Sequence, residues 1–183
     1  MLRNKQNLIL IFFLCLLIFM SRLVPHVANF SPIFALSLFI GFLSSDWRLR
    51  YLPLLAILAS DLFLGFYQPG VMLTVYLSLL LTVLAGIALK KSYSYSLALS
   101  YSLISAILFF ALTNWAVWFF GTWYSADLTG LQQSYLLAIP FFKNTLLSNF
   151  VYSAFFFGAY QIYLNYQTHQ RWTKENTQDV LAK

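Results

Sequence analysis

The stretch Val71–Leu89 reads VMLTVYLSLLLTVLAGIAL, and a second stretch, Tyr95–Phe120, reads YSLALSYSLISAILFFALTNWAVWFF. Neither stretch contains a charged residue, and two lysines, Lys90 and Lys91, lie between them. A helix needs about 20 apolar residues to cross the hydrocarbon layer of a bilayer. Both stretches reach that length, so the sequence predicts two membrane-spanning helices joined by a basic turn.

Four further apolar runs lie on either side of this pair, each ended by turn-forming or charged residues. They extend approximately over Leu8–Leu23, Ser31–Leu43, Leu52–Phe66 and Tyr135–Tyr166. The runs Ser31–Leu43 and Leu52–Phe66 are short for a spanning helix. Their placement therefore depends on how the charges are distributed along the chain.

The overall composition requires lipid as part of the solvent. Hydrophobic residues make up 61% of the chain and charged residues 9%, whereas a soluble domain carries about 25% charge. The formal net charge of +6 comes from short clusters between apolar runs and not from a stripe, which argues against nucleic acid as a partner. A single cysteine, Cys15, excludes an internal disulfide.

The basic residues decide the topology. If all six runs cross the membrane and the N-terminus is inside, every one of the 11 Lys and Arg residues except Arg22 and Lys143 lies on the cytoplasmic side. If Ser31–Leu43 did not cross, most basic clusters would lie outside, against the positive-inside rule. The predicted fold is therefore all-α: a polytopic membrane protein with six transmembrane helices in residues 1–166, both ends in the cytoplasm, and a polar cytoplasmic tail in residues 167–183.

In this topology the polar residues within or next to the spans gather near the outer face. Polar groups in lipid are costly, so such residues are functional candidates by default. The candidates for substrate binding are Arg22, His26, Asn29, Asp61, Asn114, Trp118, Lys143 and Asn144. A structural alternative stays open, because Asp61 could simply pair with Arg22 or Lys143. The tryptophans could likewise form an interfacial belt, and the asparagines could join helices.

Other patterns along the chain point to packing and not to catalysis. Ser94, Ala98, Ser102 and Ala106 recur every four residues, so they share one helix face and predict a close packing seam inside the bundle. The chain has no zinc-binding helix motif, no phosphate-binding loop and no nucleophile elbow. We therefore expect a protein that is not an enzyme.

Several segments together resemble a known group of proteins. They read RLVPHVANFSP at 22–32, SDLFLGF at 60–66, TN at 113–114 and IPFFKNTL at 139–146. These segments are similar to a family of small bacterial membrane proteins that looks like the substrate-binding S components of energy-coupling-factor (ECF) vitamin transporters. The resemblance covers nearly the whole chain except the tail. It implies a six-helix S-component-like bundle with a vitamin pocket near the outer face, beneath the first loop.

By this resemblance the chain would be a multi-pass protein of the bacterial inner membrane that binds a vitamin or related micronutrient from the periplasm for uptake. Within the group it looks like the solitary cobalamin-type members, so cobalamin is the leading substrate, and no resident cofactor is implied. Asp61 and Lys143 would set the polarity of the pocket, and Trp118 would stack on a planar ligand. His26 would ligate cobalt if the substrate is a corrinoid.

The resemblance also implies partners. These are the small-molecule vitamin, the lipid bilayer and an energy-coupling module, with no nucleic acid. S components often dock to that module through a small-xxx-small motif on their first helix, but Leu8–Met20 contains only bulky residues and Cys15. This departure puts docking in doubt and leaves a solitary mode of action open.

Two other classes of function stay open. A non-catalytic scaffold of cell-envelope assembly, similar to a rod-shape determinant, would bind partner proteins and tolerate substitutions in the pocket. An intramembrane enzyme acting on a lipid or prenyl substrate would use His26 and Asp61 as acid–base groups, but nothing in the sequence orders them into a triad. The polar cluster near the outer face favours ligand binding over the scaffold.

Overall fold

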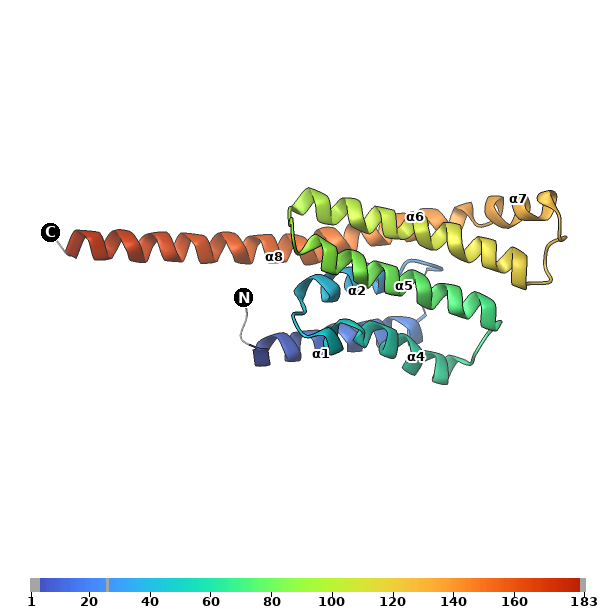
Figure 1. The fold of residues 1–183 in the computed structure, drawn as a ribbon, viewed down its shortest axis with the longest axis horizontal. Coiled ribbons are helices and arrows are strands. Elements are labelled where there is room, and N and C mark those ends of the chain that lie inside the picture. The colour runs from blue at the N-terminus through green and yellow to red at the C-terminus, as the bar shows by residue number, and fades with distance from the viewer. Residues whose placement is uncertain (1–3, 26, 182–183) are drawn as a thin grey trace.

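The computed structural model describes residues 4–25 and 27–181, and in these residues helices are joined by short loops (Figure 1). No strand occurs in these residues, and the predicted all-α class is confirmed. The helices are α1 Asn4–Leu23, α2 Ile33–Leu43, α3 Trp47–Arg50, α4 Leu52–Leu64, α5 Pro69–Leu89, α6 Tyr95–Phe120, α7 Leu128–Leu136 and α8 Ile139–Leu181.

Helix α2 lies at the centre of the bundle and packs against α1, α5 and α8. All of its residues over 34–42 are buried. A Cβ atom on Gly41 would lie 2.4 Å from the carbonyl oxygen of Val83, and one on Gly86 would lie 2.1 Å from that of Leu38. No side chain fits at these distances, so the two glycines allow the backbones of α2 and α5 to touch.

Helices α6 and α8 meet along the row of small residues predicted from the sequence. Ala98, Ser102 and Ala106 are all buried. The Ser102 hydroxyl donates a hydrogen bond to the Asn149 carbonyl oxygen (3.0 Å) and accepts one from the Ser153 hydroxyl (2.7 Å). The row is therefore a packing seam in which hydroxyl groups add hydrogen bonds to close backbone approach.

Two helices, α5 and α6, are long and apolar enough to cross a bilayer by length and composition. The apolar segments of α1, α2 and α4 are shorter. Helix α2 has 11 residues and extends over about 16 Å at 1.5 Å per residue, roughly half of the 30 Å hydrocarbon layer. Membrane-spanning capacity is thus shown for two helices and not for six.

The predicted run Tyr135–Tyr166 contains parts of two helices. Helix α7 ends at Leu136, and α8 begins at Ile139 with Pro140 in its first turn, where the missing proline N–H leaves no hydrogen bond unmade. Helix α8 then continues through the predicted boundary at residue 166 as far as Leu181, and its last part projects beyond the bundle (Figure 1).

The two ends of the bundle differ in chemistry. Helix α8 projects from one end of the bundle, and α1 begins at that same end (Figure 1). This end also carries the segments 44–51 and 89–94, which contain four basic residues, and we call it the basic end. The segments 24–32, 65–68 and 121–127 connect helices at the opposite end, which we call the loop end. The start of α1 at Asn4 and the end of α8 at Leu181 therefore lie on the same side of the bundle (Figure 1).

Candidate functional site

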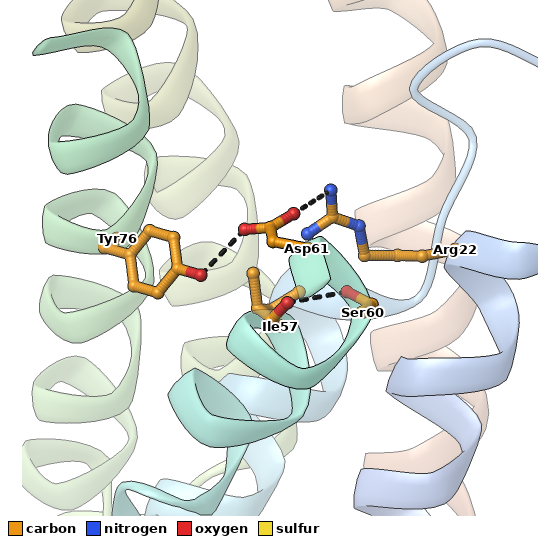
Figure 2. Close-up of polar contacts among 5 residues, drawn as sticks. All are labelled: Arg22, Ile57, Ser60, Asp61 and Tyr76. Carbon is orange, nitrogen blue, oxygen red and sulfur yellow. Dashed lines mark hydrogen bonds and ion pairs between the residues drawn. The ribbon is translucent and has the colours of Figure 1, made fainter. Parts of the chain in front are cut away.

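A buried ion pair ties three helices together near the loop end (Figure 2). The Arg22 guanidinium at the end of α1 lies 2.7 Å from Oδ1 of Asp61 in α4. The Tyr76 hydroxyl in α5 donates a hydrogen bond of 2.7 Å to Oδ2 of the same carboxylate. The Asp61 side chain is 0% exposed and that of Arg22 is 20% exposed. Oδ2 is thus hydrogen-bonded within the fold, whereas Oδ1 is paired with the Arg22 charge but makes no hydrogen bond among the described residues.

This arrangement gives Asp61 a structural role. A buried carboxylate is tolerated only when it is paired and hydrogen-bonded. Of the two pairings that the sequence left open, the structure contains the one with Arg22. Asp61 does not line either of the cavities described below, so its charge acts on a ligand only from behind the Arg22 guanidinium.

Residues 27–32 form a roof over the loop end and are held by α8. The Asn144 side chain donates a hydrogen bond of 2.9 Å to the carbonyl oxygen of Ala28. The Ser148 hydroxyl donates a longer one, of 3.4 Å, to the carbonyl oxygen of Asn29. Asn29 has a φ of 59°, a left-handed conformation that asparagine tolerates better than most residues. The turn is closed by a hydrogen bond from the Phe30 N–H to the Val27 carbonyl.

A cavity of about 350 Å³ lies beneath this roof. Its wall is mainly apolar, with polar groups from the roof, from α1 and from α8. The lining residues are Arg22, Asn29, Ser31, Ile33, Phe34, Ile57, Leu64, Tyr67, Val75, Leu79, Phe109, Thr145 and Ser148. An apolar pocket with a few convergent polar groups is the usual form of a small-molecule site.

Two hydroxyl groups in this wall are suited to contact a ligand. Ser31 Oγ is buried and has no hydrogen-bond partner within the described residues, although a buried hydroxyl normally has one. Tyr67 lies between α4 and α5, and burial, together with the negative charge of Asp61, raises its pKa to about 12 against the opposing effect of Arg22. Tyr67 therefore stays protonated and able to donate at neutral pH.

A second cavity of about 300 Å³ adjoins the first. The two share Asn29, Phe109 and Thr145, and the second extends between α6 and the start of α8 as far as Asn114 and Phe142. The Asn114 amide donates one N–H to the Phe110 carbonyl of its own helix (2.7 Å), which leaves its second N–H and its carboxamide oxygen for other partners.

The structure therefore brings part of the predicted set together. Arg22, Asn29 and Asn114 line the two cavities, and Asn144 fixes their roof. Lys143 is exposed and lines neither cavity.

Trp118 lies away from both cavities. The Trp118 indole N–H donates to the Ser125 carbonyl oxygen (3.0 Å), and this bond fastens the segment 121–127 onto α6. Trp118 lines neither cavity. His26, the expected cobalt ligand, lies outside the described residues, and within those residues no three His, Cys, Asp or Glu side chains form a metal-binding group.

Sequence reasoning missed Tyr67, Tyr76, Ser31, Thr145 and Ser148. Each is an ordinary polar residue in or next to an apolar run, and only the packing of α4, α5 and α8 against the roof brings them to one place. Ser31 carried a local signal, because it lies between Phe30 and a proline in the same loop as Asn29.

The comparisons with known proteins give a family but no activity. No characterised protein among curated sequences and no solved structure matched the chain. A family model described as "Family of unknown function (DUF6580)" matches residues 2–172, which include α1 to α7 and most of α8. The protein therefore belongs to this family of unknown function, DUF6580.

Proposed function

We propose that this protein is a substrate-binding component of the bacterial inner membrane that captures a vitamin or related micronutrient from the periplasmic side. In the proposed topology six segments, α1, α2, α4, α5, α6 and α8, pass through the bilayer, and both ends lie in the cytoplasm. The distribution of Lys and Arg supports this topology. The loop end, with its cavities, then faces the periplasm, as in the S components of ECF transporters that the sequence resembles.

The observation that carries the proposal is the buried Ser31 hydroxyl in the wall of the roofed cavity. It has no hydrogen-bond partner within the described residues, and leaving a buried hydroxyl unpaired costs about 1–3 kcal/mol. A ligand that accepts from or donates to Ser31 would recover this free energy. Tyr93 Oη and Asn149 Oδ1 are likewise buried and unpaired within the described residues but line neither cavity, so it is the position of Ser31 in the cavity wall that supports binding of a polar ligand.

The cavity volume indicates the size of that ligand. Volumes of about 350 and 300 Å³ are at the lower end of the range for drug-sized ligands, about 300–1,000 Å³. A corrinoid is much larger than either cavity. The cavities in this conformation suit a smaller vitamin with an apolar part, and a cobalamin-type substrate requires residues 27–32 to move away from Asn144 and Ser148.

The first test is native mass spectrometry of the protein purified gently from its own host, with an absorbance spectrum of the same sample. We expect a bound mass in the range of a vitamin, and corrinoid absorbance would name cobalamin. A protein without bound ligand that also shows no thermal shift with a panel of vitamins would contradict the proposal and favour the scaffold function.

The variant Ser31→Ala tests the site itself. Because Ser31 Oγ has no partner in the fold, its removal should leave the melting temperature unchanged or higher. Ligand affinity should fall about tenfold, the effect of one hydrogen bond of about 1.4 kcal/mol. Isothermal titration with the identified ligand measures the affinity, and differential scanning fluorimetry measures stability.

Ser37→Ala is the matched control. The Ser37 hydroxyl is also buried, but it donates to the Ile33 carbonyl of its own helix (2.7 Å) and lines neither cavity. Its affinity should equal that of the wild type. If Ser31→Ala and Ser37→Ala bind the ligand equally well, the assigned site is wrong even though the protein binds a vitamin.

A further inference from the structure

Two cations converge on one short loop at the basic end. Arg50 donates from Nε to the carbonyl oxygen of Ser44 (3.3 Å) and from a terminal nitrogen to that of Ser45 (3.1 Å). Lys90, directly after α5, donates to the same Ser44 carbonyl (3.3 Å) and to the Ser45 hydroxyl (3.1 Å). The two positive charges are therefore held side by side, on neutral oxygen atoms.

No carboxylate neutralises this pair in the part of the chain that the structure describes. The one ion pair there is Arg22–Asp61, at the opposite end. Asp46 lies nearby in sequence, but its carboxylate caps α3 by accepting from the Arg48 N–H (2.9 Å). Burial and the positive charge of Arg50 lower the pKa of Lys90, in keeping with two cations held together without a paired carboxylate.

The two cations also keep donors for a ligand. Arginine has five N–H donors and the lysine ammonium three, whereas Arg50 and Lys90 each make two hydrogen bonds here. Lys91 and Arg48 add two exposed cations to the same end. The Arg48 guanidinium lies 5.6 Å from the centre of the Trp47 ring, and Trp47 is 64% exposed.

These features fit the headgroup layer of a membrane. Exposed tryptophan is typical of the membrane–water interface, and basic pockets between helix ends on the cytoplasmic side bind anionic headgroups. In the proposed topology, the ends of α2 and α5 lie at the cytoplasmic surface, which is rich in anionic lipid. A protein partner would not need the tryptophan at headgroup depth.

We propose that Arg50 and Lys90, with Arg48 and Lys91 around them, form a binding site for the phosphate headgroup of an anionic phospholipid of the inner leaflet. A phosphate oxygen would accept from the remaining N–H groups of Arg50 and Lys90 and supply the missing negative charge. This site rests on the topology proposed above, but it does not depend on the ligand at the loop end.

The test uses the full chain in detergent micelles to which either phosphatidylglycerol or phosphatidylcholine is added. Native mass spectrometry counts bound lipid, and the thermal shift reports its effect on stability. We expect phosphatidylglycerol to be retained in preference to phosphatidylcholine. Arg50→Gln and Lys90→Gln should each weaken retention about fivefold, the effect of one cation near an anionic surface. Arg171→Gln removes an equal charge on the projecting part of α8 and should have no effect.

Two further arms separate the alternatives. Lys91→Gln removes an exposed cation without touching the loop hydrogen bonds, so a weaker retention in this variant cannot result from misfolding and supports the site. Inorganic phosphate should not reproduce the thermal shift, and if it does, the ligand is a soluble anion and the lipid site is wrong. Equal retention of both lipids also overturns the proposal and leaves the cluster to an acidic protein partner. None of these readouts involves a vitamin.

Discussion

At the scale of single residues, Asp61 joins three helices through one carboxylate. Replacing Asp61 by Ala leaves the Arg22 guanidinium largely buried without its counter-ion and the Tyr76 hydroxyl without its acceptor. Removing one partner of a buried pair costs about 3–5 kcal/mol. Because Arg22 is 20% exposed, we expect a loss near the lower value, about 3 kcal/mol, measured as the free energy of unfolding in detergent.

Two companion variants identify the cause of that loss. Tyr76→Phe removes one hydrogen bond to the carboxylate and should cost less than Asp61→Ala. The double variant Arg22→Met with Asp61→Leu removes both charges, so it should be more stable than Asp61→Ala alone. If Asp61→Ala retains full stability and loses only ligand binding, the carboxylate belongs to the ligand site and our structural assignment is wrong.

The sequence was a better guide to which residues are candidates for the site than to which residues contact one another. The sequence identified Arg22 and Asp61 because polar groups within apolar runs are rare and conspicuous, and it identified Asn29 because the loop after the first run lies at the outer face in the predicted topology. It could not choose between Arg22 and Lys143 as the partner of Asp61, since both lie at similar depth in a six-helix topology. Nor could it find Tyr76, because one tyrosine among many in apolar helices carries no signal about which face it occupies.

At the scale of helices, the contact between α2 and α5 depends on two glycines. A Cβ atom added to Gly86 would meet the Leu38 carbonyl oxygen at 2.1 Å, so the backbones must move apart in Gly86→Ala. Overpacking of a tight contact costs about 1–3 kcal/mol. We expect a lower melting temperature in detergent for Gly86→Ala, and a similar loss for Gly41→Ala.

Gly158 in α8 provides the matched control. The nearest atoms to an added Cβ are those of the Tyr95 ring, at 3.9 Å, an ordinary contact distance. Gly158→Ala should therefore leave the melting temperature unchanged or raise it, because alanine favours the helix by about 1 kcal/mol over glycine. Equal effects of Gly86→Ala and Gly158→Ala would show that helix propensity, and not contact between α2 and α5, determines stability.

The helices themselves were predicted unevenly. The long apolar stretches correspond to α5 and α6 with little error, because length and composition decide them. Helix α3 was missed because four residues carry no periodicity. Helix α7 was missed because it is short and polar, although Asp127 caps its first turn by accepting from the Gly130 N–H and such a cap is a helix-start signal. The polar tail was expected as an extension without assigned structure, but α8 continues through it to Leu181.

At the scale of the whole molecule, the two ends of the bundle have complementary roles under one topology. The cavities and the ion pair lie at the loop end, and the convergent cations lie at the basic end. Positive charge favours the cytoplasmic side. One orientation alone satisfies both this rule and capture from the periplasm: the basic end lies inside and the cavities lie outside. Both proposals therefore depend on a single measurable property, the side of the membrane on which each loop lies.

Cysteine labelling measures that property directly. Cys15→Ala removes the native thiol, and single cysteines are then introduced by Ser92→Cys at the basic end and Thr122→Cys at the loop end, both at exposed positions. A membrane-impermeant maleimide should label Thr122→Cys in intact spheroplasts, whereas Ser92→Cys should react only after permeabilisation. If Ser92→Cys reacts in intact spheroplasts and Thr122→Cys does not, the orientation is reversed, and capture from the periplasm and the inner-leaflet lipid site both fail. If both positions react in intact spheroplasts, they lie on the same side of the membrane, so α6 between them does not cross it and the six-pass topology is wrong.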